Sequence, residues 1–278
     1  MRILFITSSR IGDAILSTGV LSHLLDRHPE ARLTVVCGPL AAPLFEAIPQ
    51  IERILAVTKK RYSAHWLDIW KACMSRRWDI IVDLRGSAVS SFLRSGTCYV
   101  KRGGLGRGHV VEQLARLLDL DEPPDPRIWT TPEHWQDAEE LLPAGPPTIA
   151  VAPVANWRGK QWRVANFVEL TRRLSAADGI LPDARIVVLG SEEDRTQAQA
   201  MIASIPPGLR YDFVGRIDLL TAFHCLRHCH FYVGNDSGTT HLDAAAGVPT
   251  LALFGPSREE HYRPWGCWTS IEIGRAHV

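Results

Sequence analysis

The residues with the most obvious chemical use lie in one short segment, residues 233–241, which reads VGNDSGTTH. The segment follows an apolar run and opens a helical pattern. Gly238 allows the backbone to approach a ligand closely, while Ser237, Thr239 and Thr240 offer hydroxyl groups. Unpaired N–H groups at a helix N-terminus favour an anion such as a diphosphate. Asp, Ser and Thr are also preferred helix caps, so the alternative is an ordinary capped helix.

A second candidate loop, residues 153–162 (PVANWRGKQW), also follows a strand-like run. Its Lys160 carries a cation that can neutralise phosphate beyond the end of a strand. A solvated lysine on a surface loop is the simpler interpretation when this segment is taken alone.

Asp13 follows the first apolar run, residues 3–7, and precedes a helical pattern. A carboxylate at this position can accept a proton from a hydroxyl group that attacks a substrate. An acidic residue in the first turn of a helix is also stabilised by the helix dipole, and the spacing alone does not decide between the two roles.

Two other kinds of site are disfavoured. His224, Cys225, His228, Cys229 and His230 have the i, i+4 spacing of metal ligands. They fall in a helix that enters a buried strand, where Cys and His often fill the core, and a second ligand pair is missing nearby, so we predict no metal site. Residues 8–13 contain one glycine where a dinucleotide-binding GxGxxG motif needs three, which argues against an oxidoreductase.

The elements that must position these residues alternate along the chain. Short apolar runs typical of strands are separated by patterns with helical periodicity, which predicts βαβ units and parallel sheets. The predicted strands are residues 3–7, 32–37, 53–57, 79–84, 148–152, 185–189, 211–214, 231–233 and 250–254. The predicted helices include residues 39–47, 64–74, 164–174, 195–205, 219–227 and 240–246.

The alternation is interrupted between residues 120 and 147, where Pro and acidic residues are dense. We therefore place a domain boundary near residue 145 and predict two Rossmann-like α/β halves. In such folds ligands bind beyond the carboxyl ends of the strands, so we expect the two halves to face a central cleft.

The composition is that of an ordinary globular protein, with 278 residues, 46% of them hydrophobic and 22% charged. The length favours two domains. The formal net charge of +1 predicts no nucleic-acid partner. The six cysteines contain no CxxC pair, and no apolar run reaches the ~20 residues of a membrane span. We expect a cytoplasmic protein with reduced thiols.

Taken together, these segments resemble glycosyltransferase family nine, the ADP-heptose:lipopolysaccharide heptosyltransferases. The resemblance covers nearly the whole chain. It is carried by IGDAILSTGVLSHLLDRHPEARLTVV at residues 11–36, WDIIVDLRGSAVSSFL at 78–93, GKQW at 159–162 and, above all, VGNDSGTTHLDAAAGVPTLALFGPS at 233–257.

The resemblance implies a GT-B fold, with an acceptor-binding domain at residues 1–145 and a nucleotide-sugar-binding domain at 146–278. It implies an inverting, metal-independent transfer of heptose from ADP-heptose to an inner-core lipopolysaccharide acceptor, with no cofactor besides the donor. Asp13 is then the candidate base. The implied donor site consists of Lys160, Asp236, Ser237, Gly238, Thr239, Thr240 and His241, together with Glu193 and Asp194, which compete with Glu192 to hold the ribose.

Two further functions stay open: a transferase of the same family that uses another nucleotide sugar, and a nucleotide-binding protein without turnover. Thr239 stands where many relatives carry an apolar residue or proline, which bears on the donor contacts. The chain also stops soon after Trp265, and its last residues, 273–278 (IGRAHV), match one frame of a common sequencing adapter. We therefore expect the second domain to be incomplete at its end.

The first half carries most of the positive charge. Residues 1–116 contain 17 Lys and Arg against 9 Asp and Glu, whereas residues 117–145 contain 1 against 8. We expect the basic residues to contact an anionic glycolipid acceptor and to bring the protein to the inner membrane as a peripheral partner. Scattered solvated charge is the alternative. The predicted acceptor contacts are Arg10, Lys59, Lys60, Arg61, Arg85, Lys101 and Arg102.

Overall fold

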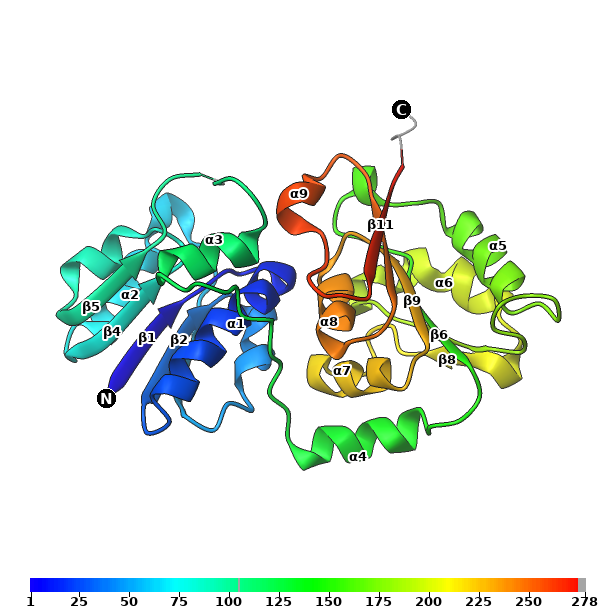
Figure 1. Ribbon diagram of the computed structural model, residues 1–278, viewed down its shortest axis with the longest axis horizontal. Coiled ribbons are helices and arrows are strands. Elements are labelled where there is room, and N and C mark those ends of the chain that lie inside the picture. The colour runs from blue at the N-terminus through cyan, green and yellow to red at the C-terminus, as the bar shows by residue number, and fades with distance from the viewer. Residues whose placement is uncertain (105, 275–278) are drawn as a thin grey trace. The chain divides into compact units, whose positions relative to one another are not determined.

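The computed structural model describes residues 1–104 and 106–274, and the chain divides into two compact units, residues 1–130 and 131–278. Each unit is built on a twisted parallel sheet with helices on both faces (Figure 1). The predicted pair of Rossmann-like α/β domains is confirmed.

The sheet of unit 1 has the strand order β3-β2-β1-β4-β5 over the described residues, and all its pairs are parallel. The strands are β1 (Arg2–Ile6), β2 (Arg32–Cys37), β3 (Ile51–Ala56), β4 (Trp78–Asp83) and β5 (Ser95–Val100). The helices are α1 (Ile11–Arg27), α2 (His65–Cys73) and α3 (Val110–Leu117), with 3₁₀ turns η1 (Pro39–Phe45), η2 (Arg61–Ser63) and η3 (Ala88–Phe92).

Successive side chains of β1 point to opposite faces of this sheet. Leu4 and Ile6 pack with Ile69 of α2 and Val89 of η3 in one core cluster. Right-handed crossovers place α1, between β1 and β2, on the face opposite α2, because the chain runs outward from β1 to β2 and returns from β3 to β4. Both faces are therefore covered, which is why the strand reads as a continuous apolar run.

The sheet of unit 2 has the order β11-β10-β9-β6-β7-β8 in the part of the chain that the structure describes, again with parallel pairs. Its strands are β6 (Thr148–Ala152), β7 (Arg185–Val188), β8 (Arg210–Asp212), β9 (Phe231–Asn235), β10 (Thr250–Phe254) and β11 (Thr269–Ile273). Its helices are α4 (Pro132–Leu141), α5 (Val164–Leu174), α6 (Arg195–Ser204), α7 (Leu219–Arg227), α8 (Gly238–Ala246) and α9 (Glu259–Tyr262), with 3₁₀ turns η4 (Arg158–Lys160), η5 (Glu192–Asp194) and η6 (Pro207–Leu209).

The two units meet in sequence at residues 130 and 131, fifteen residues before the predicted boundary. The difference comes from α4, which contacts α7. The ring Nδ1 of His228 lies 2.8 Å from the carbonyl oxygen of Leu142, and Arg185 donates a hydrogen bond to the carbonyl of Pro143 at 2.7 Å. Of the Pro-rich and acidic segment, the part up to residue 130 belongs to unit 1, where the backbone N–H of Arg127 donates to the hydroxyl of Thr18 at 3.0 Å, and the rest belongs to unit 2.

Most predicted elements are present within one or two residues of their predicted ends. The predicted helix at residues 39–47 is instead a 3₁₀ helix, because Pro39 and Pro43 lack the N–H groups that an α-helix requires. In the described residues no helix is long and apolar enough to cross a membrane. Of the last six residues, to which the sequence drew attention, 275–278 lie outside the described range.

Candidate active site

The order of the strands reverses once in each sheet. In unit 1 the strand order reverses between β1 and β4, and in unit 2 it reverses between β6 and β9. Ligands of open α/β sheets bind at such a switch point, beyond the carboxyl ends of the strands. Asp13 follows β1, while Lys160 follows β6 and Asp236 follows β9. Asp13, Lys160 and Asp236 therefore fall at these two switch points.

Asn235, the last residue of β9, joins the two loops of the unit 2 switch point. Its side chain is fully buried. The amide Nδ2 donates to the carbonyl of Pro153 at 2.8 Å, and Oδ1 accepts from the backbone N–H of Trp162 at 2.9 Å. The loop that carries Lys160 is thus fixed at both ends to the strand that carries Asp236. The sequence analysis assigned no role to Asn235, although it lies inside the segment that was singled out.

Lys160 and Asp236 form a partly buried ion pair. The Lys160 Nζ lies 2.5 Å from Asp236 Oδ2, and the side chain of Asp236 is only 7% exposed. A Cβ atom at Gly255 would lie 2.7 Å from the carbonyl oxygen of Gly159, so glycine is needed for the loop after β10 to support the lysine loop. The carboxylate of Asp236 and the loop after β10 therefore hold the ammonium group in place.

The N-terminus of α8 lies directly after Asp236. Ser237 is the N-cap residue, yet within the described residues its side chain makes no capping hydrogen bond, which leaves the first N–H groups of the helix for a ligand. The hydroxyl of Thr240 donates to the carbonyl of Asn235 at 2.7 Å and lies 2.9 Å from the hydroxyl of Tyr232. Because Thr240 is buried and its hydroxyl is already hydrogen-bonded, we expect its backbone N–H, and not its hydroxyl, to contact a bound ligand. His241 is also buried.

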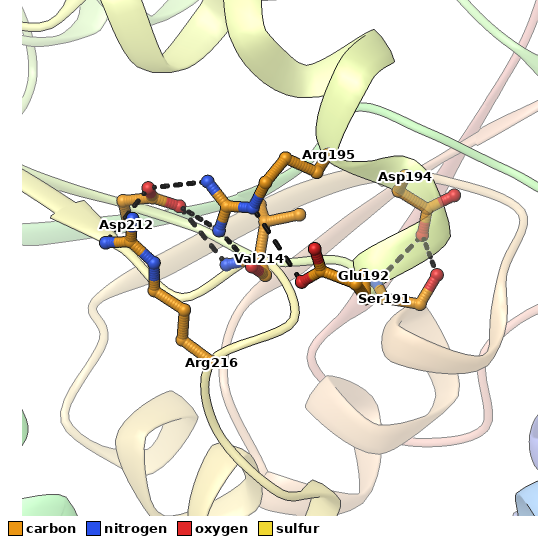
Figure 2. Close-up of polar contacts among 7 residues, drawn as sticks. All are labelled: Ser191, Glu192, Asp194, Arg195, Asp212, Val214 and Arg216. Atoms are coloured by element: carbon orange, nitrogen blue, oxygen red, sulfur yellow. Dashed lines mark hydrogen bonds and ion pairs between the residues drawn. The ribbon is translucent and has the colours of Figure 1, made fainter.

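The three acidic residues predicted to compete for the ribose lie in η5, and Figure 2 shows that Glu192 and Asp194 have different partners. Asp194 Oδ2 accepts from both the backbone N–H and the hydroxyl of Ser191 at 2.8 Å, so one of its oxygens closes the turn. Glu192 Oε2 lies 3.9 Å from Nε of Arg195 and its side chain is 74% exposed. Glu193 is exposed as well.

A salt-bridge cluster fixes this acidic turn to the end of β8 (Figure 2). Arg195, at the start of α6, donates to Asp212 through two nitrogens at 3.0 and 3.2 Å and also to the carbonyl of Val214. Arg216 lies 3.2 Å from the same carboxylate. Burial raises the pKa of Asp212, but the hydrogen bonds from Arg195 and Val214 and the charges of Arg195 and Arg216 together lower it.

Asp13 occupies the first turn of α1 and is partly exposed. Its Oδ2 accepts a hydrogen bond from the hydroxyl of Ser8 at 3.1 Å. Burial lowers the pKa of the nearby Lys101, and the negative charge of Asp13 partly opposes that shift. Lys101 follows β5, so a carboxylate and an ammonium group from different strand ends act on each other here.

The predicted acceptor contacts fall in three places on unit 1. Arg10 is the exposed N-cap residue of α1, and Lys59, Lys60 and Arg61 lie in the connection between β3 and α2. Arg85 is held over the ring of Trp66 at 5.6 Å from its centroid, in a loop that is fixed by hydrogen bonds to the buried carboxylate of Asp83. Lys101 and Arg102 line a hollow of about 510 Å³.

Two residues that the sequence analysis did not select complete this hollow. Arg107 and Arg116 line it together with Lys101 and Arg102, so four cationic side chains surround one space. Arg116 also donates a hydrogen bond to the carbonyl of Arg107 at 2.6 Å. Both belong to the basic stretch before residue 117, and the charge count was therefore a signal for the region although not for the residues.

The His and Cys residues around α7 have packing roles. Burial raises the pKa of Cys225 to about 12 and holds that of Cys229 well above its usual value, so both are neutral thiols. His230 Nδ1 accepts from the backbone N–H of Thr148 at 3.3 Å. Across residues 1–104 and 106–274, no group of three or more His, Cys, Asp or Glu is arranged to hold a metal ion.

Residues 109–271 match the family described as glycosyltransferase family 9 (heptosyltransferase), which is more than half of the chain. The chain belongs to glycosyltransferase family 9. The match includes α8, Lys160 and the acidic turn η5. The protein is accordingly an enzyme, a glycosyltransferase of the heptosyltransferase family, and the predicted family is confirmed.

Known family 9 proteins resemble this chain over most of its length. Lipooligosaccharide heptosyltransferase 2 of Haemophilus influenzae is 23% identical, covering 95% of this chain and 86% of that protein. A family 9 glycosyltransferase structure from Veillonella parvula superposes with a TM-score of 0.81 at 20% identity, covering 98% and 86% of the two chains. The structure of the E. coli ADP-heptose lps heptosyltransferase II has a TM-score of 0.77 at 20% identity and covers 98% and 90%. These two structures share the fold of this family 9 protein.

Proposed function

We propose that the protein transfers heptose from ADP-heptose to an inner-core lipopolysaccharide acceptor, with inversion at the anomeric carbon and without a metal ion. The observation that carries the proposal is the fixed position of Lys160 beside the N-terminus of α8, at the switch point of a parallel sheet. The names of the Haemophilus and E. coli relatives support heptose as the sugar, and the E. coli name supports ADP as the carrier.

On the donor side, the leaving diphosphate must be stabilised as negative charge develops on it. Lys160 supplies one cation, and the first N–H groups of α8, from Gly238 to Thr240, supply donors and the positive end of the helix dipole. Asp236 holds the lysine at 2.5 Å. These groups do the work that a divalent cation does in other glycosyltransferases, which supports a reaction without metal or cofactor.

On the acceptor side, a hydroxyl group must lose its proton as it attacks. Asp13 accepts that proton, the acceptor oxygen forms a bond to the anomeric carbon on the face opposite the leaving group, and the bond from that carbon to the diphosphate breaks so that ADP departs as an anion. Lys101 and the three arginines of the 510 Å³ hollow offer contacts for the anionic groups of the acceptor. An acceptor carried on a lipid would bring the enzyme to the cytoplasmic face of the inner membrane.

The test is mass spectrometry of the product formed from ADP-heptose and a Kdo-bearing lipid acceptor. The expected result is an acceptor whose mass has increased by one heptose, with release of ADP. If the enzyme transferred a sugar only from a different nucleotide sugar, ADP-heptose would be wrong as the donor and the transferase would have another substrate. Tight donor binding with neither transfer nor hydrolysis of the donor would identify a nucleotide-binding protein without turnover and overturn the proposal.

A further inference from the structure

An apolar groove of about 370 Å³ opens on unit 1, between α2 and η3. It is lined by Trp66, Leu67, Trp70, Ala88, Val89 and Phe92. Phe92 is 74% exposed and Leu67 is 52% exposed. Large apolar side chains that gather on a surface mark a site of interaction more often than single exposed ones do.

The groove is a built feature of α2 and not a consequence of loose packing. His65, Ile69 and Cys73 follow each other at four-residue spacing and turn the buried stripe of α2 toward the sheet. Trp66 and Trp70, one position further along, form a second stripe at the edge of the groove. The indole Nε1 of Trp70 donates to the carbonyl of Phe92 at 3.4 Å, which ties η3 to α2 beside the groove.

Positive charge surrounds the groove. Residues 59–71 and 85–94, which carry its lining and its approaches, contain six basic side chains and one acidic side chain. Two of the six lie over aromatic rings, Arg85 at 5.6 Å from the centroid of Trp66 and Arg61 at 4.8 Å from that of Tyr62, which is 86% exposed. Apolar and aromatic side chains next to Lys and Arg have the composition of a surface that enters the interface of an anionic bilayer.

We propose that this face, formed by η2, α2 and η3, docks on a bilayer of anionic phospholipids, with Phe92 and Leu67 entering the acyl boundary and the surrounding cations on the headgroups. The inference rests on the proposed function in one respect, since a lipid-borne acceptor lies in such a bilayer. A second copy of this chain is the other candidate for the groove. A symmetric pair would bring two surfaces of the same positive charge together, so charge complementarity favours the bilayer.

The test is flotation of the full chain with vesicles of phosphatidylglycerol and phosphatidylcholine, compared with vesicles of phosphatidylcholine alone. We expect binding to the anionic vesicles that weakens in high salt. Phe92→Ser should reduce partitioning by about tenfold, because an inserted phenyl ring gains transfer free energy that serine lacks. The matched control is Ile180→Ser on unit 2, whose side chain is also 74% exposed and which should bind like the wild type.

A second pair of variants tests the charge. Lys71→Gln combined with Arg94→Gln should weaken binding to anionic vesicles and reduce its salt dependence, whereas Arg172→Gln on α5, with a side chain that is 65% exposed, should not. Absence of vesicle binding by the wild type, or equal losses for Phe92→Ser and Ile180→Ser, would overturn the proposal. A dimer in lipid-free solution that Phe92→Ser dissociates would assign the groove to self-association and overturn it as well.

Failure of this inference can be told apart from failure of the proposed function. Phe92→Ser should leave kcat unchanged on a deacylated, water-soluble acceptor, since the residue lies outside the donor and acceptor sites. If the wild type binds anionic vesicles but transfers no heptose to any acceptor, the docking surface stands and the proposed function falls. If the wild type transfers heptose to the soluble acceptor but does not bind vesicles, the proposed function stands and the docking surface falls.

Discussion

Asp13 has two candidate roles, general base and helix-terminal charge, and the structure is compatible with both geometries. The carboxylate lies in the first turn of α1, where the dipole stabilises it, and only its Oδ2 is occupied by the hydroxyl of Ser8. A proton acceptor needs a vacant oxygen within reach of substrate, whereas a dipole effect needs only the charge. The two roles therefore differ in what a neutral isostere does to turnover.

We predict that Asp13→Asn lowers kcat by roughly 10²–10⁴, because the amide cannot accept a proton under these conditions. Loss of the helix-terminal charge should cost only about 0.3–1 kcal/mol of stability, and the Kd for ADP should not change. Steady-state kinetics, calorimetric titration with ADP and thermal melts measure the three quantities. The control is Asp26→Asn at the other end of the same helix, and near wild-type turnover of Asp13→Asn would leave the dipole as its only role.

For Lys160 we predict weaker donor binding. Lys160→Gln removes the cation from the diphosphate site and leaves the buried Asp236 without its partner, so the Kd for ADP should rise by about tenfold to a hundredfold, as expected for a hydrogen bond to a charged group. Calorimetric titration checks the value. Arg158→Gln, an exposed cation in the same 3₁₀ turn, should bind ADP like the wild type, and equal effects of the two variants would show that Lys160 has no special role.

At the scale of elements, the cluster of Arg195 and Asp212 holds η5 and α6 against the end of β8 (Figure 2). The pKa of Asp212 is lowered in the folded protein. Its charge therefore stabilises the fold above the unfolded pKa of about 3.9, and this stabilisation is lost as pH falls through the lower folded value.

We predict that Asp212→Asn lowers the melting temperature at pH 7 by roughly 2–6 °C. The gap between the variant and the wild type should begin to close as pH falls below about 4, and should close fully once pH has passed the lower folded pKa, where the wild-type carboxylate is also neutral. Thermal melts over a pH series measure this. Glu169→Gln, which breaks an exposed ion-pair group on α5, is the control and should have little effect at pH 7. A gap that is constant over pH would indicate a packing effect.

The pKa of Asp243 in α8 is shifted in the opposite direction to that of Asp212. Asp243 is fully buried, its Oδ2 accepts from the hydroxyl of Thr250 at 2.6 Å, and burial raises its pKa well above the usual value despite this hydrogen bond. The folded protein thus keeps a proton that the unfolded chain releases above pH ~3.9. Stability from this group is full below that pH and declines as pH rises toward the folded pKa.

We predict that Asp243→Asn, which keeps the acceptor for Thr250 but cannot ionise, flattens the pH dependence of the unfolding free energy. Relative to the variant, the wild type should lose up to about 1.4 kcal/mol per pH unit as pH rises from the unfolded pKa toward the raised folded pKa. Urea unfolding at several pH values provides the comparison, and the difference cancels the contributions of other titrating groups. Parallel curves for the two proteins would mean that Asp243 is ionised in the fold.

The buried elements could be predicted from the sequence because their apolar runs are bounded by polar residues. β6, α5, α7 and β10 have the predicted ends. β5 and β11 were missed because they are edge strands with exposed polar positions and Gly96 in the first of them, so neither has an apolar run. α3 was missed as well, although His109 and Glu112 form its capping box.

The positions of the candidate site residues after strands could be predicted from the sequence where a polar or charged residue follows an apolar run. Lys160, Asp236 and Asp13 each follow a strand, and parallel topology brings such positions to one edge of their own sheet. The role of Asn235 depends on its two hydrogen bonds to a loop more than seventy residues earlier in the chain, which no local pattern reveals. The separate positions of Glu192 and Asp194 likewise depend on Arg195 and on the turn at Ser191.

At the scale of the whole molecule, charge is divided between the two units. Unit 1 contains 18 Lys and Arg against 13 Asp and Glu, and unit 2 contains 13 against 17. The unit with the excess of cations is the one that carries the hollow lined by Lys101 and three arginines. In the proposed function, an anionic acceptor would be attracted to unit 1 over a long range, whereas Lys160, which is paired with Asp236, would bind the donor diphosphate at contact distance.

This difference predicts that the KM values for the two substrates respond differently to salt. The Debye length falls from about 10 Å at 0.1 M to about 3 Å at 1 M ionic strength. Salt therefore weakens the interactions of exposed cations more than those of a partly buried ion pair. The KM for a deacylated anionic acceptor should rise steadily with salt while the KM for ADP-heptose changes little. Initial rates measured at fixed saturation of the other substrate, across a series of NaCl concentrations, give both values without contributions from a bilayer.

At low ionic strength, Lys60→Ala should produce part of the rise in acceptor KM that high salt produces in the wild type. The ammonium group of Lys60 lies 2.7 Å from Asp68, but both side chains are more than half exposed, and such a pair holds its cation only weakly. The variant should raise the KM for the acceptor and reduce its dependence on salt, whereas Arg173→Ala, which removes an even more exposed cation on unit 2, should do neither. If the acceptor KM is independent of salt and of Lys60, the positive charge of unit 1 is solvated surface, and the acceptor must be recognised by uncharged contacts.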